Sequence, residues 1–157
     1  MKPRVYLETT IPSYLTAWDS RDLIVCSHQQ VTREWWQLRR QDFEIYISQY
    51  VIDEVSAGDP EAARRRLEIL ADVPLLDPSD EVVDLAEQLI KRIPIPPRAA
   101  ADALHIAIAA VHEIHFLLTW NCTHIANAEL RGTIESICRE FGYHPPVICT
   151  PEELLKE

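Results

Sequence analysis

Glycine is scarce in this chain, with 3 residues among 157, and no stretch is rich in glycine and serine. Long flexible linkers are therefore not expected, and no internal repeat divides the sequence. Hydrophobic runs are also short, because none approaches the ~18 consecutive apolar residues of a membrane-spanning helix. A chain of this length supports one hydrophobic core, so we predict a single domain over residues 1–157 with no membrane segment.

Cysteine is present but shows no metal-binding or disulfide spacing. No Cys-x-x-Cys pair occurs, so reduced and mostly buried thiols are expected. A secretion signal is also missing, because the N-terminus reaches an acidic residue before any apolar run of signal-peptide length. The sequence therefore predicts a cytoplasmic protein with four free cysteines: Cys26, Cys122, Cys138 and Cys149.

Positive charge is in deficit, with 15 Lys and Arg against 25 Asp and Glu and a formal net charge of −10. A protein that holds nucleic acid through a broad basic surface is disfavoured, because such binding rests on cations that neutralise phosphates. A nuclease is not excluded. A cluster of carboxylates adds negative charge to the metal-free chain, and that charge is locally reversed when a metal ion binds.

Short apolar segments alternate with amphipathic segments along the chain, which predicts strands that alternate with helices. Strands are expected at residues 4–7, 43–47, 73–76, 116–119 and 147–149. Helices are expected at residues 22–40, 50–56, 61–71, 98–113 and 129–141. Three more helices are predicted from their N-caps, at Thr10, at Ser79 and at the capping box 150–153 that ends the chain. The alternation predicts an α/β fold, a three-layer α/β/α sandwich around a mostly parallel sheet.

Four side chains with oxygen ligands stand at the ends of these predicted elements: Glu8, Glu54, Asp102 and Asn121. Ligands of parallel sheets bind beyond the carboxyl ends of the strands, where Glu8 and Asn121 are expected. Asp102 lies in the first turn of its helix, on a different face from the apolar stripe of residues 104, 107, 108 and 111, and can point into the same crevice. Hard divalent cations need several oxygen ligands from distant parts of the chain, so the four predict a Mg²⁺ or Mn²⁺ site.

Hydrolysis of a phosphodiester requires an activated water and neutralisation of charge on the phosphate, and a metal held by carboxylates supplies both. We expect Glu8 and Asp102 to be direct metal ligands and Glu54 to orient or deprotonate the water. Asn121 is expected to fix a metal-bound water or a phosphate oxygen. The hydroxyls of Thr9 and Thr119 are expected to donate hydrogen bonds to phosphate.

Each of these residues also has a plainer explanation. Glu8 can be a surface carboxylate at a strand end, and Asp102 can simply favour the helix dipole. Asn121 suits any turn after a strand, and Asp53 competes with Glu54 for the inward position. Two histidines follow the candidates closely, His105 and His124, and packing explains such residues more often than catalysis does.

Four segments together resemble the PIN domain, specifically the VapC-like ribonucleases of bacterial type II toxin-antitoxin pairs. They are Val-Tyr-Leu-Glu-Thr-Thr-Ile-Pro-Ser-Tyr-Leu at 5–15, Ser-Gln-Tyr-Val-Ile-Asp-Glu at 48–54, Asp-Ala-Leu-His-Ile-Ala at 102–107 and Leu-Leu-Thr-Trp-Asn-Cys-Thr-His-Ile at 117–125. The resemblance implies an α/β/α sandwich, an acidic pocket with Mg²⁺ or Mn²⁺, and endonucleolytic cutting of RNA. It also implies a homodimer and an antitoxin partner.

The sequence departs from this family at two of the four positions. The first acidic residue is usually Asp, but here it is Glu8, whose side chain is one methylene longer. The fourth position is Asn121, which brings an oxygen without charge. Three carboxylates and one amide favour a single Mg²⁺ over a preformed metal pair. Two other functions stay open: a catalytically weakened PIN-like binding or scaffold protein, and a phosphatase, which the Glu-Thr-Thr sequence at residues 8–10 disfavours.

Overall fold

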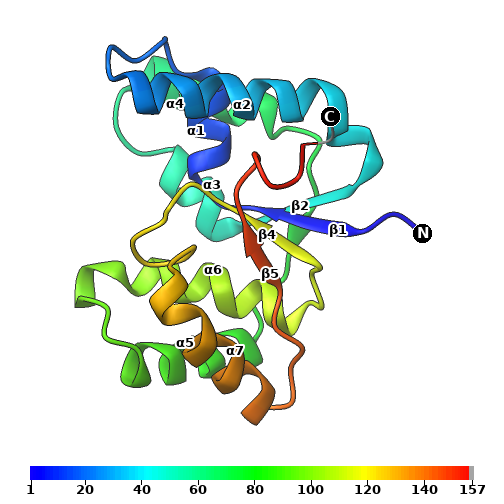
Figure 1. Cartoon of the computed structure of the whole chain (residues 1–157), viewed down its shortest axis with the longest axis vertical. Coiled ribbons are helices and arrows are strands. Elements are labelled where there is room, and N and C mark those ends of the chain that lie inside the picture. The colour runs from blue at the N-terminus through cyan, green and yellow to red at the C-terminus, as the bar shows by residue number, and fades with distance from the viewer. Residues whose placement is uncertain (156–157) are drawn as a thin grey trace.

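The computed structural model describes residues 1–155 as a parallel sheet between two layers of helices (Figure 1). The five strands are arranged in the order β3-β2-β1-β4-β5. The strands are β1 (Arg4–Leu7), β2 (Glu44–Ser48), β3 (Leu75–Leu76), β4 (Phe116–Leu118) and β5 (Val147–Cys149). The helices are α1 (Thr10–Thr16), α2 (Leu23–Arg39), α3 (Gln49–Val55), α4 (Pro60–Ile69), α5 (Asp80–Arg92), α6 (Ala100–Val111) and α7 (Ala128–Glu140). The predicted α/β/α sandwich is therefore confirmed.

The central strand β1 is the most deeply buried part of the sheet. Val5, Tyr6 and Leu7 have no exposed surface, as expected for a parallel strand covered on both faces. Tyr6 lies opposite Tyr46 of β2 and Leu117 of β4. Because all neighbours of β1 run parallel to it, the carboxyl ends of β2, β1 and β4 meet at one edge of the sheet.

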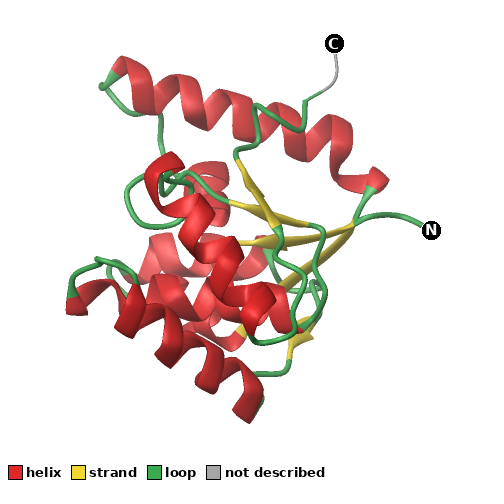
Figure 2. Cartoon of the chain, turned by 60° about the horizontal axis from the view of Figure 1, so that its bottom comes forward, coloured by secondary structure: helices red, strands yellow, loops and turns green. Residues whose placement is uncertain are grey.

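Helices α1, α2 and α4 cover one face of the sheet, and α5, α6 and α7 cover the other (Figures 1 and 2). Helix α3 follows β2 without a loop and contacts both α4 and α6. The sandwich thus places the start of α3 and the start of α6 near the carboxyl edge of the sheet. No helix within residues 1–155 is long and apolar enough to cross a membrane.

Several helix ends follow from single capping residues. The Asp22 carboxylate accepts hydrogen bonds from the backbone of Ile24 and Val25 at the start of α2. Asp59 caps α4, which has Pro60 at its first position. In α5 the predicted apolar stripe is buried against the core: Val82, Leu85, Ala86 and Leu89.

Three sequence-based expectations about helix ends are corrected by the structure. Thr10 is the first residue of α1 rather than its N-cap. Its hydroxyl donates to the Glu8 carboxylate and accepts the backbone N–H of Trp120, instead of accepting a backbone N–H of the helix. Ser79 precedes α5 but makes no capping hydrogen bond with its side chain. Residues 151–154 form turns rather than a helix, although Glu153 accepts a hydrogen bond from the Thr150 backbone. The rest of that predicted helix, 156–157, lies outside the described residues.

Two further differences concern burial and strand length. Strand β3 has two residues instead of the four expected at 73–76. Helix α6 lacks a clear polar face, because Ala103, His105 and every residue from 106 to 110 are buried.

All four cysteines are free, with Cys138 and Cys149 buried and the other two at least partly accessible.

Candidate active site

Glu8 follows β1 directly and is almost completely buried, with 4% of its surface exposed. Its Oε1 atom accepts hydrogen bonds from the Thr10 hydroxyl (2.5 Å), the Thr10 backbone N–H (3.2 Å) and the Thr119 hydroxyl (2.6 Å). Burial raises the pKa of the Glu8 carboxyl, against the opposing effects of His105 and of these hydrogen bonds. The plainer explanation of Glu8 as a surface carboxylate is therefore wrong.

Glu54 is the inward residue of the acidic pair in α3. Its Oε1 accepts hydrogen bonds from the Thr9 hydroxyl and from Nε2 of His105, both at 2.5 Å. Asp53 is exposed, and within the described part of the chain its side chain accepts a hydrogen bond only from Gln49 of its own helix. Burial by itself would raise the pKa of Glu54, but the hydrogen bond and charge of His105 together with Thr9 outweigh it and lower that pKa.

Asp102, in the first turn of α6, has 15% of its side chain exposed. Its Oδ2 lies 3.1 Å from Nδ1 of His124, a residue of the loop that follows β4. Asn121 belongs to the same loop, and its Oδ1 accepts the backbone N–H of His124 at 3.1 Å. His124 thus links the loop after β4 to α6 through its contact with Asp102. The amide oxygen of Asn121 stabilises the turn of this loop by accepting the His124 N–H.

These contacts bring all four predicted residues to the carboxyl edge of the sheet. The roles predicted for the two threonines differ from what the structure shows. Thr119 is fully buried and its hydroxyl donates to Glu8, while the Thr9 hydroxyl donates to Glu54. Each hydroxyl has a single proton, which a carboxylate accepts in this structure. Both instead fix the carboxylates, a role that requires packing between β1, β4 and α3.

The donor chemistry of the site fits a hard divalent cation. Each of the three carboxylates has one oxygen bound by its neighbours and a second oxygen with no hydrogen-bond partner among residues 1–155. Such oxygens are the ligands that Mg²⁺ and Mn²⁺ prefer. Within the same residues, however, no three His, Cys, Asp or Glu side chains are grouped as a metal-binding cluster. Metal binding by Glu8 and Asp102 therefore stays a prediction.

The two histidines are the functional candidates that sequence reasoning passed over. His105 has no exposed surface and contacts Glu54, and His124 contacts Asp102. The available signal was spacing, because His105 is one helical turn beyond Asp102 and His124 is three residues beyond Asn121. Spacing alone does not say which carboxylate each ring meets.

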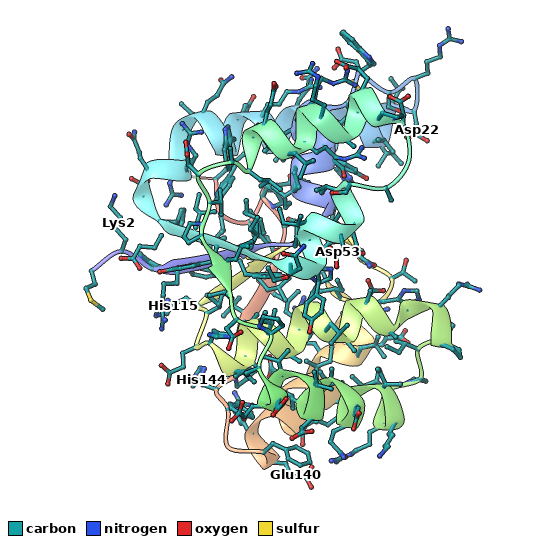
Figure 3. All side chains as sticks on the ribbon, turned by 180° about the vertical axis from the view of Figure 1, so that it is seen from behind. Lys2, Asp22, Asp53, His115, Glu140 and His144 are labelled. Atoms are coloured by element: carbon teal, nitrogen blue, oxygen red, sulfur yellow. The ribbon has the colours of Figure 1, made fainter. Side chains whose placement is uncertain are left out.

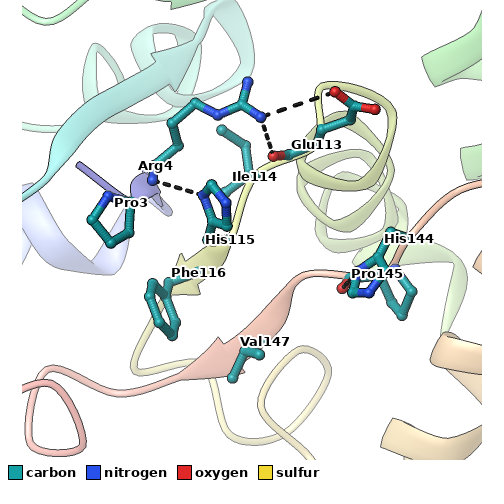
Figure 4. A pocket seen from close by; sticks show the side chains of 9 residues that line it. All are labelled: Pro3, Arg4, Glu113, Ile114, His115, Phe116, His144, Pro145 and Val147. Carbon is teal, nitrogen blue, oxygen red and sulfur yellow. Dashed lines mark hydrogen bonds and ion pairs between the residues drawn. The ribbon is translucent and has the colours of Figure 1, made fainter. Parts of the chain in front are cut away.

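A surface cavity of about 570 Å³ lies at the opposite edge of the sheet, where the strands begin (Figure 4). Arg4, Phe116 and Val147 line it from the starts of β1, β4 and β5. His115 and His144, which also line it, lie on the left side of the view in Figure 3, and Asp53 lies near its middle. This cavity is separate from the carboxylates, and the chemistry that the site offers does not extend to it.

Comparison with known proteins agrees with this geometry. A chain of the crystal structure of VapBC2 from Rickettsia felis bound to a DNA fragment from their promoter has the same fold, with a TM-score of 0.59 and 18% sequence identity. The match covers 94% of this chain and 98% of that chain. No curated protein matches the sequence. The family model of the PIN domain matches residues 5–121, which span β1 to the loop after β4, and the chain therefore belongs to the PIN domain family.

Proposed function

We propose that this PIN domain is a divalent-metal-dependent endoribonuclease and the toxin of a type II toxin-antitoxin pair. The observation that carries the proposal is the set of three carboxylates at one sheet edge, each held through one oxygen and open at the other. They come from the end of β1, from α3 and from α6. PIN domains are generally nucleases, and the family match includes all four candidate residues.

The residues of the site divide the chemistry between them. A divalent cation held by Glu8 and Asp102 would neutralise charge on the scissile phosphate and activate a water. Glu54 has a lowered pKa, so its carboxylate is ionised at neutral pH and can orient that water and accept its proton. His124 fixes the direction of Asp102, and Thr10 and Thr119 fix that of Glu8. Asn121 shapes the loop that carries His124.

We extend the proposal to the partners of this chain. By similarity to VapBC2, a cognate antitoxin is expected. A homodimer and a cytoplasmic location are also part of the proposal. Three large apolar side chains between α1 and the start of α2 are exposed and suit a protein contact: Trp18, Leu23 and Ile24. Light scattering of the purified chain tests the dimer. The antitoxin is tested by asking whether a small gene lies immediately upstream and whether its protein product copurifies with the chain.

Metal binding and RNA cleavage test the enzyme directly. Mn²⁺ is titrated by calorimetry into the wild type, into Asp102→Asn and into the matched control Asp53→Asn, whose carboxylate is exposed and outside the site. Cleavage of a fluorescent single-stranded RNA is measured with Mg²⁺, with Mn²⁺ and with EDTA. We expect cleavage that EDTA abolishes, a loss of at least about 100-fold in Asp102→Asn, and activity within about 2-fold of wild type in Asp53→Asn.

A wild-type protein that neither binds Mn²⁺ nor cleaves RNA overturns the enzyme proposal. That result favours the binding or scaffold protein, in which Glu8 and Asn121 are the remains of a weakened metal site. Cleavage of DNA but not of RNA would keep the nuclease and overturn the substrate class.

A further inference from the structure

His105 is a completely buried histidine whose two ring nitrogens both have polar partners. Nε2 lies 2.5 Å from Oε1 of Glu54, and Nδ1 lies 2.7 Å from the Tyr6 hydroxyl. The Tyr6 hydroxyl in turn lies 2.7 Å from Oγ of Ser48, and Tyr6 and Ser48 are also fully buried. A continuous line of hydrogen bonds therefore runs from the end of β2 through β1 and α6 to the carboxylate of Glu54 in α3.

We propose that His105 is a positioning residue of the active site, which holds the Glu54 carboxylate in the direction that orients the attacking water. Tyr6 and Ser48 hold the imidazole ring in turn. The inference rests on the proposed function, because it gives a role to the carboxylate that the reaction uses. Its physical content is nevertheless a property of the folded chain and can be measured without RNA.

The buried line is anchored at its inner end. Tyr6 is in the central strand of the sheet, and burial raises the pKa of its hydroxyl well above the ordinary value, so the phenol stays neutral. A neutral phenol both donates and accepts. It can donate to Nδ1 while accepting from Ser48, so that the Nε2 proton is directed to Glu54. The ring of Tyr50 packs edge-on against His105 at 6.5 Å between centroids.

The Glu54 side chain, at the outer end of this line of hydrogen bonds, needs contacts that hold it in one direction. The Glu54 side chain is 36% exposed, and a glutamate that is free to change rotamer loses a defined direction. Two charge-assisted hydrogen bonds to Oε1, from His105 and Thr9, fix that atom and leave Oε2 for the water. The titratable groups that surround this pair are Tyr6 and Glu8 from β1 and its end, and Tyr50 from α3.

Two substitutions at residue 105 distinguish the contributions of the two ring nitrogens. His105→Gln places an amide N–H at the reach of Nε2, whereas His105→Asn places an amide oxygen at the reach of Nδ1 and removes the donor to Glu54. His144→Asn is the matched control, because His144 is exposed and, among residues 1–155, its side chain bonds only to the neighbouring Pro145 carbonyl. Tyr6→Phe removes the anchor while leaving both His105 and Glu54 in place.

The first measurement is the pKa of Glu54 from a ¹³C NMR titration of the side-chain carboxyl in metal-free buffer. His105→Asn is expected to raise it by about one unit or more, His105→Gln by less, and Tyr6→Phe by less than His105→Asn. The second is the pH profile of RNA cleavage. We expect kcat to fall roughly 10–100-fold in His105→Asn with little change in KM, with partial rescue in His105→Gln, and the acid limb to move upward.

The outcomes distinguish the two proposals. If the pKa of Glu54 responds as expected but no protein cleaves RNA, the proposed function fails and the positioning role stands. If the wild type cleaves RNA and His105→Asn leaves both the Glu54 pKa and the acid limb unchanged, the positioning role is overturned. The positioning role is also overturned if His105→Asn and His105→Gln change the Glu54 pKa and RNA cleavage equally. Equal effects would indicate lost packing, which does not depend on which ring nitrogen is replaced. If His105→Asn does not fold, Tyr6→Phe decides, and an unchanged Glu54 pKa there counts against the proposal.

Discussion

Thr119 is the residue whose single hydroxyl does most to assemble the site, and Thr119→Val removes that hydroxyl with almost no change in shape. The Thr119 Oγ1 atom donates to Oε1 of Glu8 at 2.6 Å and accepts the backbone N–H of Asn121 at 2.9 Å. Valine has the same branched outline, so the packing of the fully buried side chain is retained. The substitution therefore isolates the polar contribution.

The magnitude follows from these two hydrogen bonds. Loss of a hydrogen bond to a charged group costs about 1.5–3 kcal/mol, and an N–H left without a partner costs about 1–3 kcal/mol when buried. Asn121 is only partly buried and can recover part of its loss to water, so we expect the free energy of unfolding to fall by about 2–4 kcal/mol. For a chain of this length that corresponds to a decrease in Tm of roughly 5–15 °C.

Urea unfolding followed by tryptophan fluorescence measures this change, with the thermal midpoint as a second reading. Thr119→Ser keeps the hydroxyl and is expected to lose less than half as much stability as Thr119→Val. Thr123→Val is the matched control, because Thr123 is exposed in the same loop, and its stability is expected to stay within about 0.5 kcal/mol of wild type. If the valine variant is as stable as wild type, or the serine variant loses as much, the hydroxyl does not carry the stability assigned to it.

Two further predictions concern the buried acid and the core. Burial raises the pKa of Glu8 in the folded protein, so the contribution of Glu8 to the free energy of unfolding is greatest at low pH and falls as pH rises from the ordinary glutamate value through the raised folded value. Glu8→Gln is expected to lose this part of the pH dependence and to match or exceed wild-type stability above this pH range. Urea unfolding in EDTA at several pH values measures the difference. If the free energy of unfolding changes with pH by the same slope in both proteins, the prediction is contradicted. Leu89→Ala, at a fully buried position of α5, is expected to cost about 2–5 kcal/mol by the same measurement, while the same change at the exposed Leu38 is expected to cost less than about 1 kcal/mol.

Much of the fold follows from patterns within short segments. The apolar run before Glu8 predicts a buried strand, and the periodic Val82 and Leu85 predict the buried face of α5; both are confirmed. The placement of Glu8 at a strand end also follows, because the apolar run ends there. These features depend on neighbours in sequence, and a period of two or of 3.6 residues identifies them.

The remaining features depend on contacts between distant segments. Thr10 has the sequence signature of an N-cap, but a buried carboxylate two residues earlier competes for its hydroxyl. The partners of His105 come from β1 and α3, and no periodicity in α6 reveals them. The burial of α6 on almost all sides likewise results from its position between α5 and the sheet, which a single helix cannot disclose.

The sequence separation between Glu8 and its most distant hydrogen-bond donor has a consequence for synthesis of the protein. Strand β1 leaves the ribosome before its hydrogen-bonded neighbour β4 and the Thr119 hydroxyl, which follow 111 residues later. Contacts of such long range form late, because a large loop must close first. A nascent or truncated chain that ends before β4 therefore exposes an unpaired edge of β1 and cannot assemble the site. Any activity of this domain therefore begins only after β4 and Thr119 have been synthesised.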